Sequence, residues 1–279
     1  MRIVGIVRIG ERARRALARS GGEAAPLAGF AEGPYFSAGA EMIWVGARLP
    51  AMHPRAVITS RPQPGGAALH FDALPAQGWT PQLPRVDRAV AARILANLGP
   101  LCRALLAGAA PRGFGALLAH GTPAFPLDRA VARVQALACA YRDDDPDAVR
   151  AASMPLLGLG TGLTPSGDDL AGAALFGRRL QASPCRAWTR SAAQLSREVE
   201  TRSHVVSAAL FRDLVRGQSF APLHAIAAAL AAGDQRRALV AAGELIAIGH
   251  SSGWDMFTGL VIGITARCSA PLTPGPCAH

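Results

Sequence analysis

The sequence predicts an α+β protein, in which a small β-rich part, sheet-like or barrel-like, precedes a mainly α-helical part. Short β-branched runs separated by prolines and glycines occupy residues 1–82, whereas apolar residues recur at helical spacing after residue 83. A glycine-rich loop between helices then occurs twice in the second part. We therefore expect a β-rich domain over residues 1–82, a helical domain over residues 83–270 and a tail over residues 271–279.

The N-terminal part contains two clear strand candidates, Glu41–Ala47 and Ala56–Ser60, with prolines between them. Short strands joined by turns that contain proline and glycine favour a small antiparallel sheet or barrel. A further strand candidate begins at Ala67–Phe71, after Gly65-Gly66, and we expect His53, His70 and Asp72 at the surface or in turns. The arginines of segment 12–19 are spaced along what we expect to be a solvated helix.

The second part begins after a proline-rich connector and contains several predicted helices. They span Val86–Ala107, Leu127–Tyr141, Leu170–Leu180 and Ala187–Val199. A further helix is expected to be capped by Thr201 or Ser203 and to end at Gly217. His204 and Ser207 lie one turn apart near its start, which is compatible both with a local polar face and with a shared cavity.

The segment Gly158–Asp169 combines glycine, hydroxyl and carboxylate more densely than any other part of the chain. Its sequence is Gly-Leu-Gly-Thr-Gly-Leu-Thr-Pro-Ser-Gly-Asp-Asp. Pro165 suits the start of a helix, Ser166 suits the N-cap, and Asp169 occupies the position from which a capping-box acid reaches back. We therefore predict a loop that leads into a helix capped by Ser166.

The same pattern returns in Ile246–Asp255, where a second Ser-Gly-x-Asp stands at the expected start of a helix. Gly177 and Gly263 lie equally far beyond the two serines, and an amphipathic stretch precedes each loop, at residues 147–152 and 235–242. With only two copies and a long period, a pseudo-twofold pair is expected rather than a solenoid.

Two such helix starts would bring together backbone N–H groups without partners in their own helices, at the positive ends of two helix dipoles. Facing each other, they would form a site for a small anionic or carboxylate-bearing molecule. The alternative is that both motifs are ordinary helix caps. Caps alone, however, do not require the three alternate glycines of the first loop, the second acid Asp168 or the histidine His250.

These motifs supply the candidate site residues. The candidate catalytic residues are Asp168, Asp169, His250 and Asp255. The candidate ligand-binding residues are Gly160, Gly162, Thr164, Ser166, Gly167, Ser251, Ser252 and Gly253. The carboxylates would orient loop N–H groups, hold a cation or accept a proton, and an imidazole suits proton transfer near neutral pH. No residue is assigned as a metal ligand.

The chain contains no lysine, so its basic residues are all arginines. It therefore lacks the lysine that pyridoxal phosphate, biotin, lipoate or a Walker A loop would need, and the cofactor stays unknown. The formal net charge of +10 is spread along the chain without a nucleic-acid-binding motif, which favours an anionic substrate or an acidic partner subunit over nucleic acid. No leader or membrane helix is expected, which predicts a cytoplasmic protein.

The runs Gly158–Asp169 and Gly249–Asp255 together resemble the AllH-like family, formerly a domain of unknown function and associated with a subunit of oxamate carbamoyltransferase. The order of parts is similar over nearly the whole chain. The resemblance implies a bacterial protein of ureide and purine-nitrogen catabolism. It further implies a hetero-oligomeric transferase that exchanges a carbamoyl group between carbamoyl phosphate and a small amide such as oxamate.

Three functions stay open after the sequence analysis. The first is a carbamoyltransferase subunit with a ligand site between the two loops. The second is a non-catalytic interaction subunit, whose loops are mutually packed caps and whose partner chain carries the reaction. The third, a phosphate-ester or amide hydrolase with an Asp-bound metal, would need acids that converge at metal-ligand distance.

Overall fold

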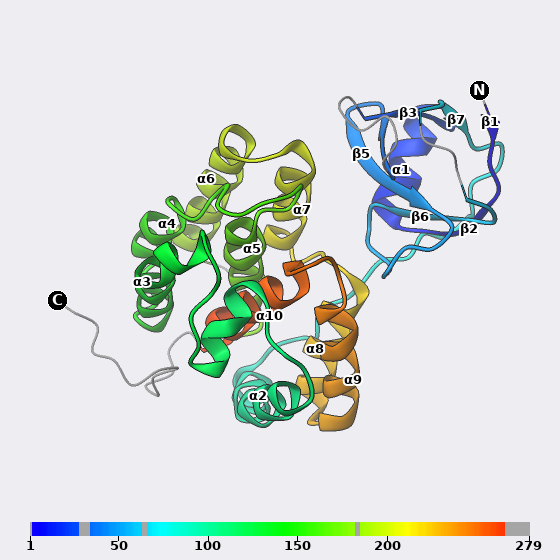
Figure 1. Cartoon of the computed structure of the whole chain (residues 1–279). Helices are drawn as coiled ribbons and strands as arrows, with labels where there is room; N and C mark the ends of the chain where they lie inside the picture. The colour runs from blue at the N-terminus through cyan, green and yellow to red at the C-terminus, as the bar shows by residue number, and fades with distance from the viewer. Residues whose placement is uncertain (1, 28–33, 63–65, 182–184, 266–279) are drawn as a thin grey trace. The chain divides into compact units, whose positions relative to one another are not determined.

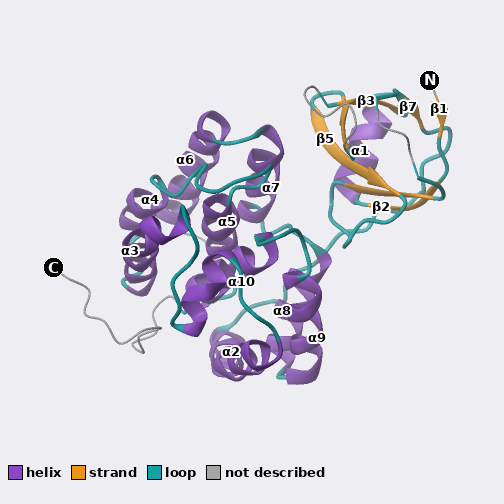
Figure 2. Ribbon diagram, viewed as in Figure 1, coloured by secondary structure: helices purple, strands orange, loops and turns teal. Residues whose placement is uncertain are grey.

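The structure is a computed structural model that describes residues 2–27, 34–62, 66–181 and 185–265 (Figures 1 and 2). The chain divides into two compact units: residues 1–82 with 219–221, and the rest of the chain from residue 83 onward. The described strands all lie in the first unit, and the described helices other than α1 lie mainly in the second, which confirms the α+β class. The predicted tail, residues 271–279, lies outside the described residues.

The N-terminal unit contains seven short strands and one helix among its described residues. They are β1 (Arg2–Ile3), β2 (Ile6–Ile9), α1 (Glu11–Arg19), β3 (Glu23–Pro26), β4 (Tyr35–Ala38), β5 (Glu41–Gly46), β6 (Ala56–Thr59) and β7 (Leu69–His70). The strands form one sheet in the order β1-β7-β3-β4-β5-β6-β2.

The two edges of this sheet are joined by the chain itself. β1 and β2 are separated only by Val4 and Gly5. Val4 N donates a hydrogen bond to His70 O of β7 (2.9 Å), and Gly5 O accepts one from Ser60 N, just beyond β6 (3.1 Å). The edge strands thus act as one bent strand that pairs on both sides, and the sheet curls into the barrel-like form that Figure 1 shows. Closure of this kind protects strand edges from pairing with other chains.

The expectation of an antiparallel sheet was wrong at two pairings. β5 pairs with β6 in parallel, and so does β1 with β7. Parallel neighbours need a connection longer than a hairpin turn. The proline-containing connection of residues 47–55 provides this between β5 and β6.

Helix α1 supplies the apolar filling of the barrel-like sheet. Ala13 and Leu17 are buried in the same cluster as residues of β2, β4, β5 and β6. The outer face of the helix is polar, as the arginine spacing predicts. Arg14 and Arg15 both pair there with Glu11, at 2.8 and 2.7 Å.

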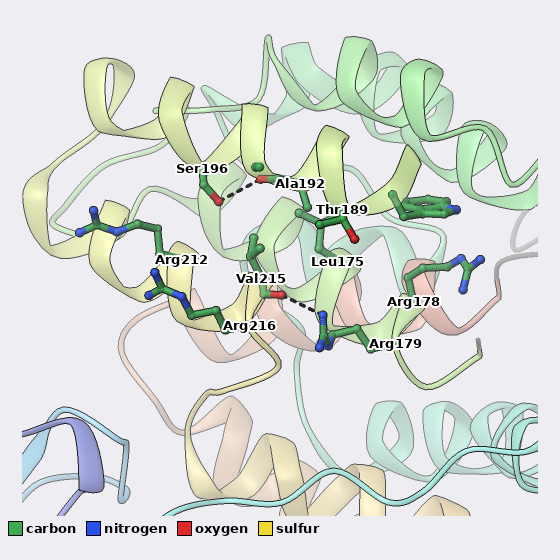
Figure 3. A pocket seen from close by; sticks show the side chains of 11 residues that line it. Leu175, Arg178, Arg179, Thr189, Ala192, Ser196, Arg212, Val215 and Arg216 are labelled. Carbon is green, nitrogen blue, oxygen red and sulfur yellow. Dashed lines mark hydrogen bonds between the residues drawn. The ribbon is translucent and has the colours of Figure 1, made fainter. Parts of the chain in front are cut away.

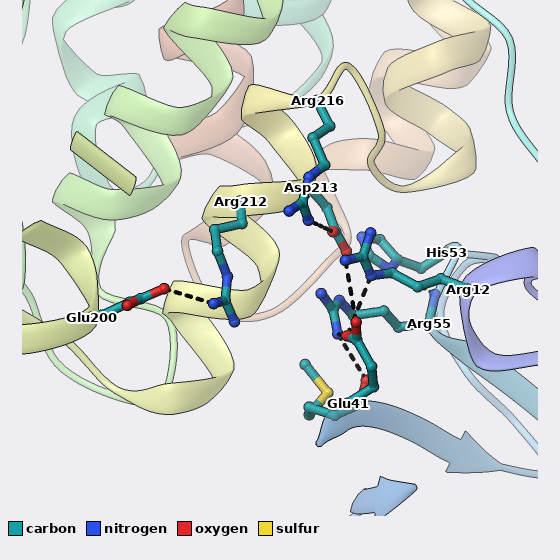
Figure 4. Close-up of polar contacts among 9 residues, drawn as sticks. Arg12, Glu41, His53, Arg55, Glu200, Arg212, Asp213 and Arg216 are labelled. Carbon is teal, nitrogen blue, oxygen red and sulfur yellow. Dashed lines mark hydrogen bonds and ion pairs between the residues drawn. The ribbon is translucent and has the colours of Figure 1, made fainter. Parts of the chain in front are cut away.

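His53 begins a turn, as expected, since its carbonyl oxygen accepts a hydrogen bond from Ala56 N (2.9 Å), but the residue is buried and not at the surface, with only 1% exposed. Its ring packs 4.8 Å from that of Phe220, which belongs to the same unit. The neighbouring Arg55 is also buried, and its guanidinium lies 2.9 Å from Glu41, which pairs with Arg12 as well (Figure 4). A charged group is tolerated in a protein interior when it is paired in this way.

The second unit is built from helices. Within the described residues they are α2 (Arg88–Gly108), η1 (Gly113–Ala119), η2 (Leu127–Ala130), α3 (Val131–Arg142), α4 (Pro146–Ser153), α5 (Ser166–Arg178), α6 (Arg186–Arg202), α7 (Val205–Val215), α8 (Ala221–Ala232), α9 (Gln235–Ile246) and α10 (Ser252–Ile264). The predicted cap of α7 was wrong. His204 is the N-cap, and its Nδ1 accepts a hydrogen bond from Val206 N (3.2 Å). Thr201 lies inside α6, and Ser203 ends that helix.

Among the described helices, α2 alone is long and apolar enough to cross a membrane by length and composition; its mean hydropathy is 1.4. We did not predict such a helix from the sequence. Only 22% of its apolar window is buried. Its buried residues recur every three or four positions, as Ala91, Ile94, Leu98, Leu101 and Leu105, and the helix contacts α9, α10 and η1. This is the pattern of an amphipathic helix with one face on a protein core.

The predicted duplication is confirmed, and it includes one helix more than the sequence indicated. The repeat consists of three helices, α3-α4-α5 in the first copy and α8-α9-α10 in the second. Between the first two helices of each copy, Asp144 and Gly233 both adopt positive φ, at 54° and 77°. The next residues, Asp145 and Asp234, cap α4 and α9 through their side chains. Matching backbone geometry at matching positions is what an internal repeat predicts.

The loops between the last two helices also correspond. Gly167 N donates to Leu159 O (2.9 Å), and Gly253 N donates to Ile248 O (3.0 Å). Eight positions separate the first pair and five separate the second, so the first loop contains three additional residues.

The helices around the repeat follow the same pseudo-twofold arrangement. In the first half of the unit α2 and η1 precede the repeat, and they pack on α9 and α10 of the second copy. In the second half α6 and α7 precede the repeat, and they pack on α4 and α5 of the first copy. Each half thus covers the other half's repeat, around the central pair α5 and α10 (Figure 2).

Candidate functional site

The structure brings the two predicted helix starts together. Helices α5 and α10 pack against each other along glycines, since a Cβ atom on Gly177 would lie 3.2 Å from the Cα of Gly263. At their N-terminal ends, Thr164 Oγ1 lies 2.9 Å from Ser252 Oγ. We call this meeting point the junction, and it is formed by Thr164, Ser166, Asp169, Ser251, Ser252 and Asp255. The sequence had placed these residues in one site without being able to measure their separation.

The predicted capping roles of Ser166 and Asp169 were wrong. Ser166 is the first residue of α5, the N-cap is Pro165, and no side chain caps the helix. Ser252 likewise begins α10 without a side-chain cap from Ser251. Because each serine lies one position inside its helix, its hydroxyl points across to the opposite helix and away from its own first turn.

The serine and aspartate side chains therefore pair across the junction. The hydroxyl of Ser252, in α10, lies close enough to the Asp169 carboxyl of α5 to lower its pKa. The hydroxyl of Ser166, in α5, does the same for Asp255 of α10. Residues that contact each other's equivalents in this reciprocal way are characteristic of a twofold interface. Ser251 lies at the same place, with its Oγ 3.4 Å from that of Ser166.

Both carboxyl groups of this pair are buried and only partly hydrogen-bonded. Asp255 Oδ1 accepts a hydrogen bond from Phe114 N (2.7 Å), whereas Asp255 Oδ2 and Asp169 Oδ2 are buried without a hydrogen-bond partner. Burial raises the pKa of Asp255 to about 6. Burial, and then the charge of Asp255, raise the pKa of Asp169 well above its ordinary value. Asp255 can therefore exchange a proton near pH 6, and the raised pKa of Asp169 favours the protonated form of that carboxyl group.

Asp168 is directed away from this pair. Its Oδ1 accepts a hydrogen bond from Gly158 N (2.8 Å), and its Oδ2 accepts from the hydroxyls of Ser203 and Ser207, the latter at 2.6 Å. It therefore ties the start of the first loop to α7. The polar face of Ser207 that the sequence indicated is accounted for by this contact.

Among the candidate glycines, Gly167 and Gly253 serve close packing. A Cβ atom on either would overlap a backbone carbonyl oxygen, that of Leu156 for the first and that of Leu245 for the second. Gly160 lies against the amide of Ser166, whereas Gly162 has a φ of 90°, is exposed and has open space where its Cβ would be. Of these four, only Gly162 leaves room for a ligand to approach its backbone.

His250 lies beside the junction with an exposed side chain, and its carbonyl oxygen accepts a hydrogen bond from Arg112 Nη1 (3.4 Å). The described residues include no group of three or more His, Cys, Asp and Glu placed to hold a metal ion.

Sequence reasoning missed the contribution of η1. Gly113 adopts a φ of 53°, which brings the amide of Phe114 to Asp255, and Gly115 lies directly against Trp254. The alternate glycines of this segment were the available signal. They mark a close backbone approach, but the partner is 141 positions away and is not evident from the sequence.

The fold and the junction define a class of protein: an α+β chain whose helical unit is an internal pseudo-dimer with a buried pair of carboxyl groups at its centre. Residues 156–264 match the family described as "Oxamate carbamoyltransferase subunit AllH". The match begins just before the first glycine loop and ends with the last residue of α10. It confirms the family resemblance over this segment, and the family's name describes one subunit of a multi-subunit enzyme.

No curated protein and no solved structure matches the chain with significant similarity.

Proposed function

We propose that this chain is a subunit of a hetero-oligomeric carbamoyltransferase that exchanges a carbamoyl group between carbamoyl phosphate and a small amide such as oxamate. The observation that carries the proposal is the family match over residues 156–264. The matched segment contains both glycine loops and both helices of the junction. It therefore links the family name to the place where the chain concentrates its buried ionisable groups.

The junction has groups suited to a small amide that carries a carboxylate. An amide NH₂ donates two hydrogen bonds, and the partnerless Oδ2 atoms of Asp169 and Asp255 can accept them. A carboxylate accepts hydrogen bonds, which the half-buried hydroxyls of Thr164 and Ser252 and the first-loop backbone at Gly162 can donate. The bound amide would thus be oriented by donors at one end and acceptors at the other.

The raised pKa values suit the proton transfer that this reaction requires. In carbamoyl transfer the amide nitrogen bonds to the carbamoyl carbon, the bond from that carbon to the phosphate oxygen breaks, and phosphate leaves. The nitrogen loses one proton in this step. A carboxylate with a raised pKa accepts such a proton better than an ordinary aspartate, and we assign this role to Asp169 or Asp255.

The second candidate is a non-catalytic subunit whose partner chain carries the reaction. One observation favours it: the residues around the junction already contact one another across the two copies. The reciprocal serine–aspartate pairs, and the packing of Gly167 and Gly253 directly on backbone carbonyl oxygens, hold the two helix starts together without a ligand. In that case the carboxyl pair would serve only to hold the two halves of the helical unit together.

Reconstitution of the complete complex separates the two candidates. The chain would be co-purified with the products of neighbouring genes, and carbamoyl transfer to oxamate would be assayed with each subunit omitted in turn. In the complete complex, Asp169→Asn and His250→Ala are expected to abolish activity while the complex still assembles. Glu244→Gln, an acid-to-amide change at an exposed position of α9, is the matched control and should keep full activity. Wild-type rates in both site variants would remove the catalytic assignment and leave the structural one.

A further inference from the structure

A cavity of about 470 Å³ lies between α5, α6 and α7, away from the junction. Four arginines line it: Arg178 and Arg179 at the end of α5, and Arg212 and Arg216 on α7 (Figure 3). Its volume is in the range of cavities that bind small molecules. Helix α5 has 13 residues, so the cavity lies about 20 Å from the junction at the other end of the same helix.

Three of these arginines have acidic partners. Arg178 Nη2 lies 2.8 Å from Asp144, Arg212 Nη1 lies 2.6 Å from Glu200, and Arg216 pairs more loosely with Asp213, at 3.8 Å (the last two pairs in Figure 4).

Arg179 is different. Its Nη1 donates to the carbonyl oxygen of Val215 (3.2 Å), and among the described residues it has no acidic partner. It is also half-buried, and burial lowers the pKa of its guanidinium. A cation that is partly desolvated and not neutralised lowers stability unless an anion joins it.

The rest of the cavity wall leaves room for a carbon skeleton attached to that anionic group. Helix α6 presents small residues, Ala192, Ala193 and Ser196, and the hydroxyl of Ser196 is turned back to the carbonyl of Ala192 (2.9 Å; Figure 3). Leu175 and Val215 provide apolar surface on the other two helices. A bare inorganic ion would leave this surface uncovered.

We propose that this cavity is a second ligand site, which binds a small organic anion. Its phosphate or carboxylate group pairs with Arg179, and its carbon skeleton covers Leu175 and Val215. An arginine guanidinium offers paired N–H donors to either group. Because the cavity is remote from the junction, the ligand acts as an effector or a stabilising ligand there and not as the carbamoyl acceptor.

The test is equilibrium binding to the purified full-length chain, by calorimetry, with phenyl phosphate, benzoate and the uncharged benzyl alcohol as probes. At least one of the two anions is expected to bind, and the one that binds more tightly identifies the head group. Arg179→Met should weaken binding about tenfold or more, as the loss of a charge-assisted contact does. Arg179→Lys, which keeps the charge, should weaken it less.

Two further variants keep the proposal falsifiable if Arg179→Met is poorly folded. Ala193→Phe fills the cavity and should abolish binding, whereas Arg190→Met removes an exposed charge from the same helix and should leave binding unchanged. Asp169→Asn should also bind the anion normally, which separates this site from the proposed function. Equal binding by Arg179→Met and Arg190→Met, unchanged binding by Ala193→Phe, or equal affinity for benzyl alcohol would overturn the proposal.

Discussion

The first copy of the three-helix repeat, α3-α4-α5, and the second, α8-α9-α10, carry the same serine and the same aspartate where these side chains meet, and different residues at neighbouring positions. Ser166 and Asp169 correspond to Ser252 and Asp255, and both pairs meet at the junction. Asp168, in contrast, corresponds to Trp254. Asp168 is hydrogen-bonded to the start of α7, whereas Trp254 packs under η1.

This difference teaches what the pseudo-twofold axis constrains. The shared serine of each copy pairs with the shared aspartate of the other copy, so both copies need these two residues. A side chain that points toward α7 or η1 contacts an element whose sequence differs between the two halves. Such positions can diverge, and so can the first loop, which is three residues longer and contains the exposed Gly162.

The largest expected effect comes from the glycines that the copies share. Gly167→Ala and Gly253→Ala would each place a Cβ atom on a backbone carbonyl, and each should lower the free energy of unfolding by about 3 kcal/mol or more. Urea denaturation would measure this. Gly243→Ala is the control, since nothing lies within 4 Å of its Cβ position in α9, and it should raise stability by about 0.5–1 kcal/mol. A loss below about 1 kcal/mol in only one of these two glycine variants would show that the copies are not packed equivalently.

The next effect concerns the shared carboxyl pair and its pH dependence. The pKa of Asp255 is about 6 in the folded protein, against an ordinary value of 3.8, so its contribution to stability is complete below about pH 4 and is lost as pH rises through 6. Asp255→Asn removes this dependence. Relative to the wild type, the variant should gain up to about 3 kcal/mol between pH 4 and pH 7. Urea denaturation of both proteins at the two pH values would measure this. If the difference in free energy of unfolding between the variant and the wild type were the same at pH 4 and pH 7, the assignment of Asp255 as a buried carboxyl with a raised pKa would be wrong.

A smaller effect is expected at the position where the copies diverge. Asp168→Asn removes the charge that accepts hydrogen bonds from Ser203 and Ser207, and it should lower the free energy of unfolding by about 2 kcal/mol. Ser207→Ala, which removes one donor, should lower it by about 1 kcal/mol. If Asp168→Asn instead abolished oxamate carbamoylation without loss of stability, the residue would belong to the reaction and not to loop anchoring.

The smallest effect on stability is expected at His250, a residue of the second loop that has no histidine counterpart in the first loop. Its side chain is exposed, so His250→Ala should change the free energy of unfolding by no more than about 0.5 kcal/mol. Thermal unfolding of the isolated chain would measure this. A substantial loss would mean that any effect of the variant on the complex is indirect.

Much of the helical unit could be predicted because its signals are local. Helical apolar spacing gave the positions of α2, α3, α5 and α6 to within a few residues of their observed ends, except that η2 forms the start of the predicted Leu127–Tyr141 helix. The two Ser-Gly-x-Asp motifs gave the duplication directly. The third helix of the repeat was missed because α3 and α8 share turn geometry at Asp144 and Gly233 rather than residue identity.

What the sequence determined by itself is the class of the fold, the duplication and the set of residues at the junction, because periodicity and repeated motifs are properties of the chain alone. Only the tertiary structure decided that Ser166 and Ser252 pair across the axis rather than cap their own helices, that Asp168 is directed away from Asp169, and that His53 is buried. Those outcomes depend on which distant backbone approaches each side chain. That approach is fixed by the packing of α5 on α10 and of the sheet on α1, which no local pattern specifies.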